Sequence, residues 1–131
     1  MSNTMELVRA WRKKSDQDLK ACGQLLQADE PLVEIIAFHA QQAVEKALKG
    51  FLLNRGAGFP KTHDLGRLLD LVEIFEPELA DLEEIINLTP YAIEARYPES
   101  TDWSGGVDPR ELLELSEKSC NRIWSFIQWS Q

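Results

Sequence analysis

The spacing of apolar residues constrains the fold of this chain more than any other feature. Apolar side chains recur at intervals of three and four residues through most of the sequence, which places them on one face of an α-helix. In the first such segment they are Leu7, Val8, Trp11, Leu19, Cys22 and Leu26. The sequence has no strand-like alternation and no hairpin signal. The pattern therefore predicts an all-α fold.

Residues that break helices divide the first half of the chain into two long helices. We expect the first from Thr4 to about Ala28, because Asp29-Glu30-Pro31 follows it. The second is expected from Pro31 to about Arg55, with proline in its first turn and glycines after its end. Its small residues favour close packing against neighbouring helices. They are Ala37, Ala40, Ala43 and Ala47.

Three further helices are predicted in the second half. A short one fits His63 to Phe75, with Thr62 as its N-cap, and Pro77 opens another. The inner face of the latter is expected to carry Leu79, Leu82, Ile86 and Ile93. After an irregular stretch from Glu94 to Val107, Asp108 and Pro109 begin the last helix. Its predicted buried residues are Leu112, Leu115, Ser119, Ile123, Phe126 and Ile127.

These helices fit one domain, spanning residues 1–131. A chain of 131 residues with 44% hydrophobic residues can bury a core. Four long helices and one short one predict an up-and-down four-helix bundle with an additional short helix.

Composition and motifs exclude several classes of function. The net charge of −8 argues against broad, non-specific nucleic-acid binding, although a local basic stripe is compatible with it. Cys22 and Cys120 fall in apolar helical patterns, which favours buried free thiols over a disulfide or metal site. No phosphate-binding glycine motif is present, and no CxxC or clustered Cys/His spacing suggests zinc, so we predict no cofactor and no metal. The sequence begins without a signal segment and has no membrane-spanning run, which predicts a cytoplasmic protein.

The second predicted helix carries a polar stripe beside its apolar face. The stripe consists of His39, Gln42, Lys46 and Lys49, spaced at three, four and three residues. Side chains at such a border can be half buried, so this set could meet an anion such as a phosphate. The alternative is that they reach solvent without a ligand, with Glu45 and Lys49 as an ordinary i,i+4 pair.

Two other polar positions are candidates for the same site. His63 lies at the start of the short helix, where it either binds a ligand or helps to pack and cap the helix. Arg96 and Tyr97 lie in the irregular stretch and offer a planar hydrogen-bond donor and a stacking ring. The alternative role for Arg96 is an ion pair that ties this stretch to the bundle.

Three segments resemble the HEPN domain family (higher eukaryotes and prokaryotes nucleotide-binding). They are FHAQQAVEKALK at residues 38–49, THDL at 62–65 and ARYP at 95–98. The resemblance runs from about Met5 to Phe126. It implies an up-and-down four-helix bundle that commonly dimerises and binds nucleotides or RNA. It also implies a partner, because prokaryotic members often occur beside a minimal nucleotidyltransferase, in pairs similar to toxin–antitoxin modules.

Many members of the family are metal-independent ribonucleases that use an Arg and a His separated by four to six residues. This sequence departs from that pattern, since seven residues separate Arg55 from His63 and no histidine follows Arg96. We therefore assign no catalytic residue and predict a non-catalytic binding and partner module. The predicted ligand-binding residues are His39, Gln42, Lys46, Lys49, His63, Arg96 and Tyr97. The alternative is a ribonuclease with an atypical site, using His39 or His63 with Arg96.

The aromatic residues near the C-terminus bear on oligomeric state. Trp124, Phe126 and Trp129 exceed what one helix face can hide easily, and a second subunit would cover the excess. This predicts a homodimer. The alternative is that Trp129 folds back on its own bundle.

Overall fold

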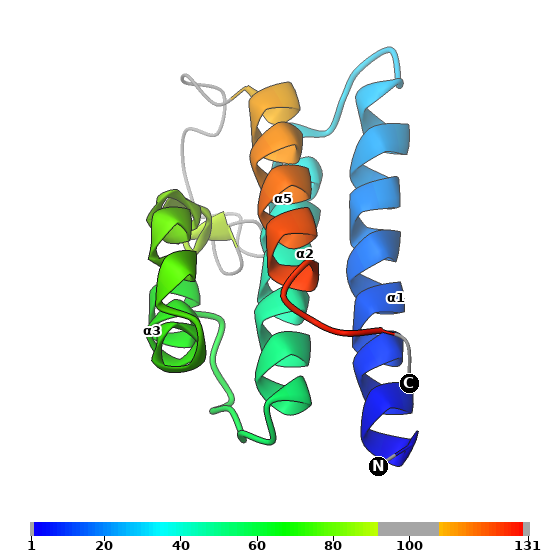
Figure 1. Cartoon of the computed structure of the whole chain (residues 1–131). Coiled ribbons are helices and arrows are strands. Elements are labelled where there is room, and N and C mark those ends of the chain that lie inside the picture. Colours follow the sequence, from blue (N-terminus) through cyan, green and yellow to red (C-terminus); the bar gives the residue numbers. More distant parts are fainter. Residues whose placement is uncertain (1, 92–107, 130–131) are drawn as a thin grey trace.

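The fold is an all-α bundle, as the sequence predicts (Figure 1). The structure, a computed structural model, describes residues 2–91 and 108–129. Within these ranges the helices are α1 (Ser2–Leu26), α2 (Val33–Asn54), α3 (Leu65–Phe75), the 3₁₀ helix η1 (Pro77–Leu88) and α5 (Pro109–Trp124). None of the helices described is long and apolar enough to cross a membrane.

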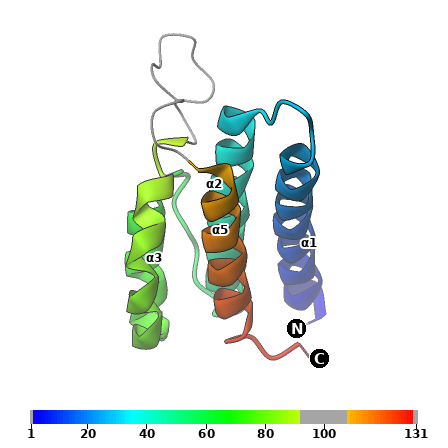
Figure 2. The same cartoon turned by 90° about the horizontal axis from the view of Figure 1, so that it is seen from above.

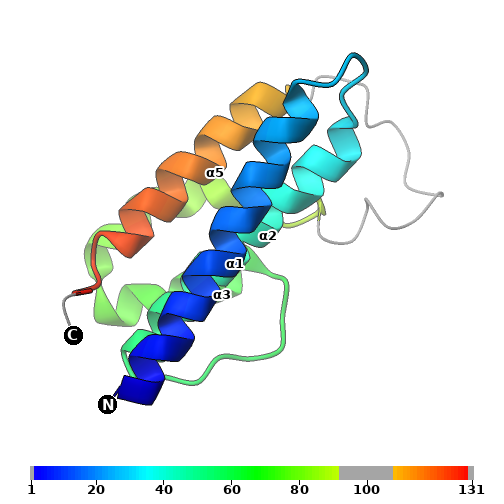
Figure 3. The ribbon, with the colours of Figure 1, turned by 90° about the vertical axis from the view of Figure 1, so that its right-hand side faces the viewer.

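Helix α2 occupies the centre of the bundle. It contacts α1, α3, η1 and α5, and so joins two groups of helices. Figure 2 shows α1 on one side of α2 and α5, and α3 on the other. Helices α1 and α2 run antiparallel, and α5 runs in the same direction as α2 (Figure 3). Residues of α2 are therefore positioned between helices.

The small residues of α2 let the flanking helices approach its backbone. All four alanines named above are fully buried. The Ser15 hydroxyl of α1 donates to the carbonyl oxygen of Ala43 at 2.7 Å, and the Ser116 hydroxyl of α5 donates to that of Ala40 at 2.7 Å. Both buried hydroxyls are thus hydrogen-bonded, which removes most of the cost of burying them.

Three predicted helix starts are wrong by about two residues, and the first of them is that of α1, which begins at Ser2 and not at Thr4. Helix α2 begins at Val33, after Leu32, so Pro31 lies before its first turn. Helix α3 begins at Leu65, and its N-cap is Asp64, which accepts a hydrogen bond from the Arg67 backbone N–H at 3.2 Å. Thr62 instead accepts a hydrogen bond from the Asp64 N–H at 3.1 Å. His63 therefore lies before α3 and not within it.

The inner face predicted for the fourth helix is corrected in part. The segment Pro77–Leu88 is a 3₁₀ helix, in which every third side chain falls on the same face. Its buried residues are Leu79, Leu82, Ile85 and Leu88. Ile86, which an α-helical spacing places inside, is 44% exposed. Ile93 and the irregular stretch 94–107 lie outside the described residues. The helix after that stretch begins as predicted.

The last helix begins at the predicted cap, and the chain after it folds back. The Asp108 carboxylate accepts from the Arg110 backbone N–H at 2.9 Å, with Pro109 in the first turn. Trp124 is buried within the bundle. The Trp129 indole N–H donates to the Trp124 carbonyl oxygen at 3.1 Å. Trp124 and Trp129 therefore pack together within one chain, which removes the argument for a dimer that rested on them.

Candidate functional site

Asp18 of α1 binds two residues of the predicted polar stripe. One of its carboxylate oxygens lies 2.8 Å from His39 Nδ1, and the other accepts from Lys46 Nζ at 2.6 Å. The Asp18 side chain is only 9% exposed. A buried carboxylate needs such partners, because removing its charge from water is costly. The α1–α2 contact therefore fixes the positions of His39 and Lys46.

Glu45 of α2 contacts four more polar side chains. It accepts from Lys49 Nζ at 2.9 Å and from Gln41 Nε2 at 3.0 Å, and His63 Nδ1 lies 2.8 Å from it. Gln42 also donates to it, at 3.4 Å, and donates to the Gln41 side-chain oxygen at 2.7 Å. Together with Asp18 and its partners these residues form one region, here called the carboxylate cluster. Its members are Asp18, His39, Gln41, Gln42, Glu45, Lys46, Lys49 and His63.

The charge of Glu45 is maintained by its partners. Burial alone would raise the pKa of this carboxyl group, but hydrogen bonds from Gln41, Lys49 and His63 outweigh burial and lower the pKa below its ordinary value. Glu45 is thus ionised at neutral pH, where the Lys49 ammonium lies beside it. The contact between Lys49 and Glu45 confirms the i,i+4 pair considered from the sequence. The Lys49 side chain is 10% exposed and the Glu45 side chain is 6% exposed.

The two histidines share one arrangement. In each, Nδ1 faces a buried carboxylate, and a neutral imidazole in this position donates its Nδ1 proton. Nε2 lies on the opposite side of the ring, and among the described residues it has no hydrogen-bond partner in either histidine. His63 has a side chain that is 46% exposed, and His39 one that is 30% exposed. Both can therefore offer Nε2 to a ligand.

The charges of the cluster balance when both histidines are neutral. The two carboxylates face two ammonium groups, so Lys46 and Lys49 each already have an anionic partner. The sequence predicted these lysines as open to an external anion, without considering Asp18 or Gln41 as part of the site. A signal for Asp18 does exist, because it falls in step with Val8, Ser15 and Cys22 on the buried face of α1.

Two predicted ligand-binding residues are not placed by the structure, and the arginine that precedes His63 contacts other parts of the fold. Arg96 and Tyr97 lie outside the described residues. Arg55 donates to Glu76 at 3.1 Å and to the Phe126 carbonyl oxygen at 2.8 Å, and its guanidinium lies 4.5 Å from the Phe51 ring centre. These contacts tie Arg55 to the core and the C-terminal segment, so it does not act with His63.

The cysteines are not candidates for chemistry. Both are buried free thiols, as predicted. Burial raises the pKa of Cys22 and of Cys120 to about 12, which keeps both protonated and poorly nucleophilic. Within the described ranges, no three His, Cys, Asp or Glu residues are grouped so that they could hold a metal ion.

The fold and this cluster define a helical-bundle domain with two carboxylate-bound histidines, His39 on the central helix and His63 just before α3. A family profile for the HEPN domain matches residues 8–128, which is nearly the whole chain. The chain belongs to the HEPN domain family. No curated protein matches it, and no solved structure does.

Proposed function

We propose that this protein is a HEPN-type module that binds a nucleotide or RNA at the carboxylate cluster. Membership of this family, over residues 8–128, is the observation that carries the proposal. The geometry supports it, because two half-exposed imidazoles are held with Nε2 free of described partners.

The structure changes how the site would recognise a phosphate. Lys46 and Lys49 are neutralised by buried carboxylates, so they contribute little net attraction. An imidazole protonated at both nitrogens donates Nδ1–H to its carboxylate and Nε2–H to a phosphate oxygen. His63, the more exposed of the two, is the principal contact in this proposal. Arg96 would add charge and Tyr97 a stacking surface, as the sequence predicts.

Calorimetric titration with ATP, GTP and a short RNA, at low and physiological salt, tests the proposal. We expect a saturable signal that weakens as salt rises and is lost in His63→Gln and Arg96→Ala. Binding that ignores salt and both substitutions, or no binding of any ligand, would contradict it.

Lys46→Ala alone is a poor test, because it leaves the buried Asp18 carboxylate without its ammonium partner. The double variant Asp18→Asn with Lys46→Met removes both charges and keeps similar side-chain sizes. The double variant keeps the net charge of the chain. The proposal predicts that it folds and still binds, but more weakly, because His39 loses the carboxylate of Asp18 while His63 keeps that of Glu45. Complete loss of binding with His63 intact would assign the main contact to the Lys46 side of the cluster.

A metal-independent ribonuclease is the second candidate, and one observation favours it. A histidine whose Nδ1 faces a buried carboxylate is oriented to accept or donate a proton at Nε2, as a general base or acid does. The expected result for this candidate is RNA cleavage in the presence of a chelator that disappears in His63→Ala and Arg96→Ala. Binding without cleavage would favour the non-catalytic module.

We also propose that the module acts with a minimal nucleotidyltransferase protein in a toxin–antitoxin-like system, and that it forms a homodimer. The support for both is membership of the family. Co-expression with a nucleotidyltransferase encoded beside it should give a stable complex. Light scattering should give twice the mass of the chain, and a monomer at micromolar concentration would exclude the homodimer.

A further inference from the structure

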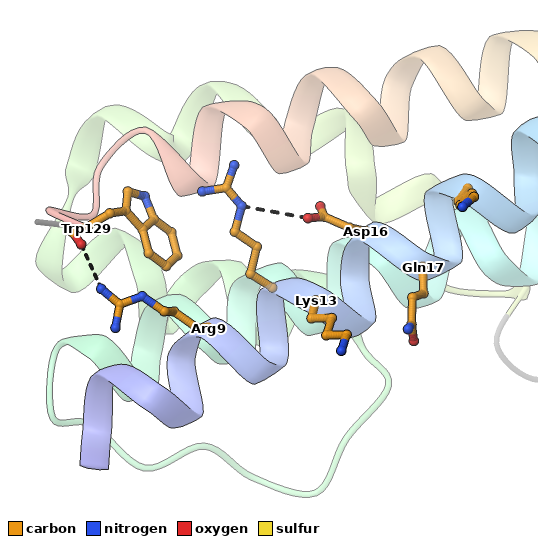
Figure 4. A pocket seen from close by; sticks show the side chains of 7 residues that line it. Arg9, Lys13, Asp16, Gln17 and Trp129 are labelled. Atoms are coloured by element: carbon orange, nitrogen blue, oxygen red, sulfur yellow. Dashed lines mark hydrogen bonds and ion pairs between the residues drawn. The ribbon is translucent and has the colours of Figure 1, made fainter. Parts of the chain in front are cut away.

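A groove on α1 lies outside the carboxylate cluster. It has a volume of about 470 Å³ and shares no residue with that cluster. Its lining comes from the outer face of α1 and from Trp129 of the C-terminal segment (Figure 4). The lining residues are Arg9, Arg12, Lys13, Asp16, Gln17, Lys20 and Trp129.

The α1 groove is basic on a protein that is acidic overall. Four cationic residues line it against one carboxylate, a local excess of three positive charges on a chain whose net charge is −8. The carboxylate of Asp16 lies 3.9 Å from Arg12, and both side chains are well exposed. Such a pair is weak in water. Lys13 and Lys20 are exposed and form no ion pair within the part of the chain that is described.

An aromatic side chain is built into this basic surface. The Arg12 guanidinium lies 4.7 Å from the centre of the Trp129 ring. Arg9 donates to the Trp129 carbonyl oxygen at 2.8 Å. The indole also packs against Trp124 in an edge-on contact, with ring centres 5.7 Å apart. These contacts hold Trp129 over α1, where its half-buried ring borders the groove (Figure 4).

The cations form a row along the helix. From Arg9 to Lys20 the helix rises by about 17 Å, at about 1.5 Å per residue. That length exceeds what one phosphate group can contact, so the row fits a ligand with repeated phosphates. Basic side chains that follow a backbone, with an aromatic ring for bases to stack on, are the features by which proteins bind single strands.

We propose that the α1 groove binds a short stretch of single-stranded nucleic acid, with phosphates along Arg12, Lys13 and Lys20 and a base against Trp129. This inference deepens the proposed RNA-related function and rests on it. The groove would hold the strand outside the carboxylate cluster. A lipid surface or an acidic peptide would meet the same charges, but neither brings a flat base to the Trp129 ring.

Fluorescence anisotropy with a labelled single-stranded oligouridine tests the proposal on the full chain. The test variant is Lys13→Glu with Lys20→Glu, and both residues are exposed, so folding should be unaffected. We expect at least a tenfold loss of affinity at low salt. Each cation that contacts a phosphate adds about 0.7 to the slope of log affinity against log salt, so the slope should fall by about 1.4.

The chain offers a matched control for this variant. Lys14 is exposed on the same helix but lies outside the α1 groove. Lys14→Glu changes the net charge in the same direction, and we expect it to weaken binding less than threefold. Equal losses per substituted lysine at positions 13, 14 and 20 would show a general charge effect and overturn the proposal.

Trp129→Leu separates base stacking from charge. We expect it to weaken oligouridine binding about fivefold or more and to leave binding of inorganic polyphosphate unchanged. Circular dichroism of the variant must match the wild type. If polyphosphate competes with the oligonucleotide equally in both proteins, the groove takes phosphate chains in general and the nucleic-acid assignment is overturned.

The two sites fail in distinguishable ways. Oligonucleotide binding that is lost in His63→Gln but intact in Lys13→Glu with Lys20→Glu would overturn this inference and leave the proposed function standing. The reverse result would support the groove and contradict the carboxylate cluster as the principal site. No binding of any single strand would overturn this inference, and no binding of ATP or GTP in addition would overturn the proposed function.

Discussion

The carboxylate cluster on α2 and the α1 groove both contain lysines, but these lysines have opposite surroundings. In the cluster, Lys46 and Lys49 each contact a buried carboxylate at less than 3 Å. In the groove, Lys13 and Lys20 are exposed without an ion pair among the described residues, and Arg12 has one distant carboxylate. The difference follows from position, since the cluster lies where α1 and α2 pack together and the groove lies on the outer face of α1.

This contrast shows that a stripe of cations is not by itself an anion site. Inside the bundle, a carboxylate from a neighbouring helix, as with Asp18, or from the same helix, as with Glu45, can neutralise a lysine of the stripe, and these charges then orient other groups. Here they orient the two imidazoles. On an outer face there is no such neighbour, so the positive charge remains available to a ligand. The same substitution should therefore have very different consequences in the two regions.

The largest difference is expected for lysine-to-methionine substitutions. Lys49→Met leaves the buried Glu45 carboxylate without its ammonium partner and should lower the free energy of unfolding by about 3 kcal/mol. Lys13→Met removes an exposed charge and should change it by less than about 0.5 kcal/mol. Urea denaturation measures both values. Similar losses in the two variants would contradict the contrast between the regions.

Two glycines allow the same comparison for packing. A Cβ at Gly50 of α2 would lie 2.9 Å from Trp124 Cη2 and 3.2 Å from Trp11 Cβ, so Gly50→Ala should destabilise the fold by about 2 kcal/mol. A Cβ at Gly23 of α1 would meet nothing within 4 Å, and Gly23→Ala should stabilise the fold by about 0.5–1 kcal/mol. Thermal unfolding of the two variants should give shifts of opposite sign. Shifts of the same sign would show that the α2 contact has room to adjust.

The effect of pH on stability should come from the cluster and not from the groove. The pKa of Glu45 is lowered in the folded protein, so its contribution is fully present above the ordinary value of 4.5 and is lost as pH falls through the lower folded value. Glu45→Gln removes that titration. We expect the free energy of unfolding of this variant to fall less steeply than that of the wild type below about pH 4.5. Parallel curves would mean that folding does not lower the pKa of Glu45.

The smallest effect is predicted for the one carboxylate of the α1 groove. Asp16→Asn removes a weak, exposed pair with Arg12, so stability should change by less than about 0.5 kcal/mol. Because the groove then gains net positive charge, affinity for oligouridine should rise about twofold at low salt. Anisotropy measures the change in affinity, and urea denaturation measures the change in stability. A clear loss of stability would show that Asp16 has a structural role.

The periodicity of the sequence predicted the fold well because helical packing depends on it directly. The alanines of α2, the Asp108 cap and most of the apolar face of α1 were readable from local spacing, but Leu7, which was predicted on that face, is 51% exposed. The spacing failed for Pro77–Leu88, where a 3₁₀ helix buries Ile85 and exposes Ile86. Ile85 and Ile86 are both apolar, so the sequence fits both the α-helical and the 3₁₀ period. Only packing against α3 and α2 decides which of the two isoleucines is buried.

Helical spacing predicted four residues of the carboxylate cluster but not the contacts that they make. Helical geometry placed His39, Gln42, Lys46 and Lys49 on one stripe, and the structure places all four in the cluster. Helical geometry could not show that Asp18, on another helix, contacts His39 and Lys46. Nor could it bring His63 to Glu45 across the connection between α2 and α3. Contacts of this kind depend on how helices dock, which a pattern within one helix does not contain.

The tautomers of the two histidines test the central claim most directly. The chain has two histidines, so a long-range ¹⁵N–¹H spectrum at a pH where the imidazoles are neutral resolves both rings. If the buried carboxylates orient the rings, both should carry their proton on Nδ1, and Glu45→Gln should change the pattern of His63 but not that of His39. Protonation of both rings at Nε2, or no response of His63 to Glu45→Gln, would contradict the account.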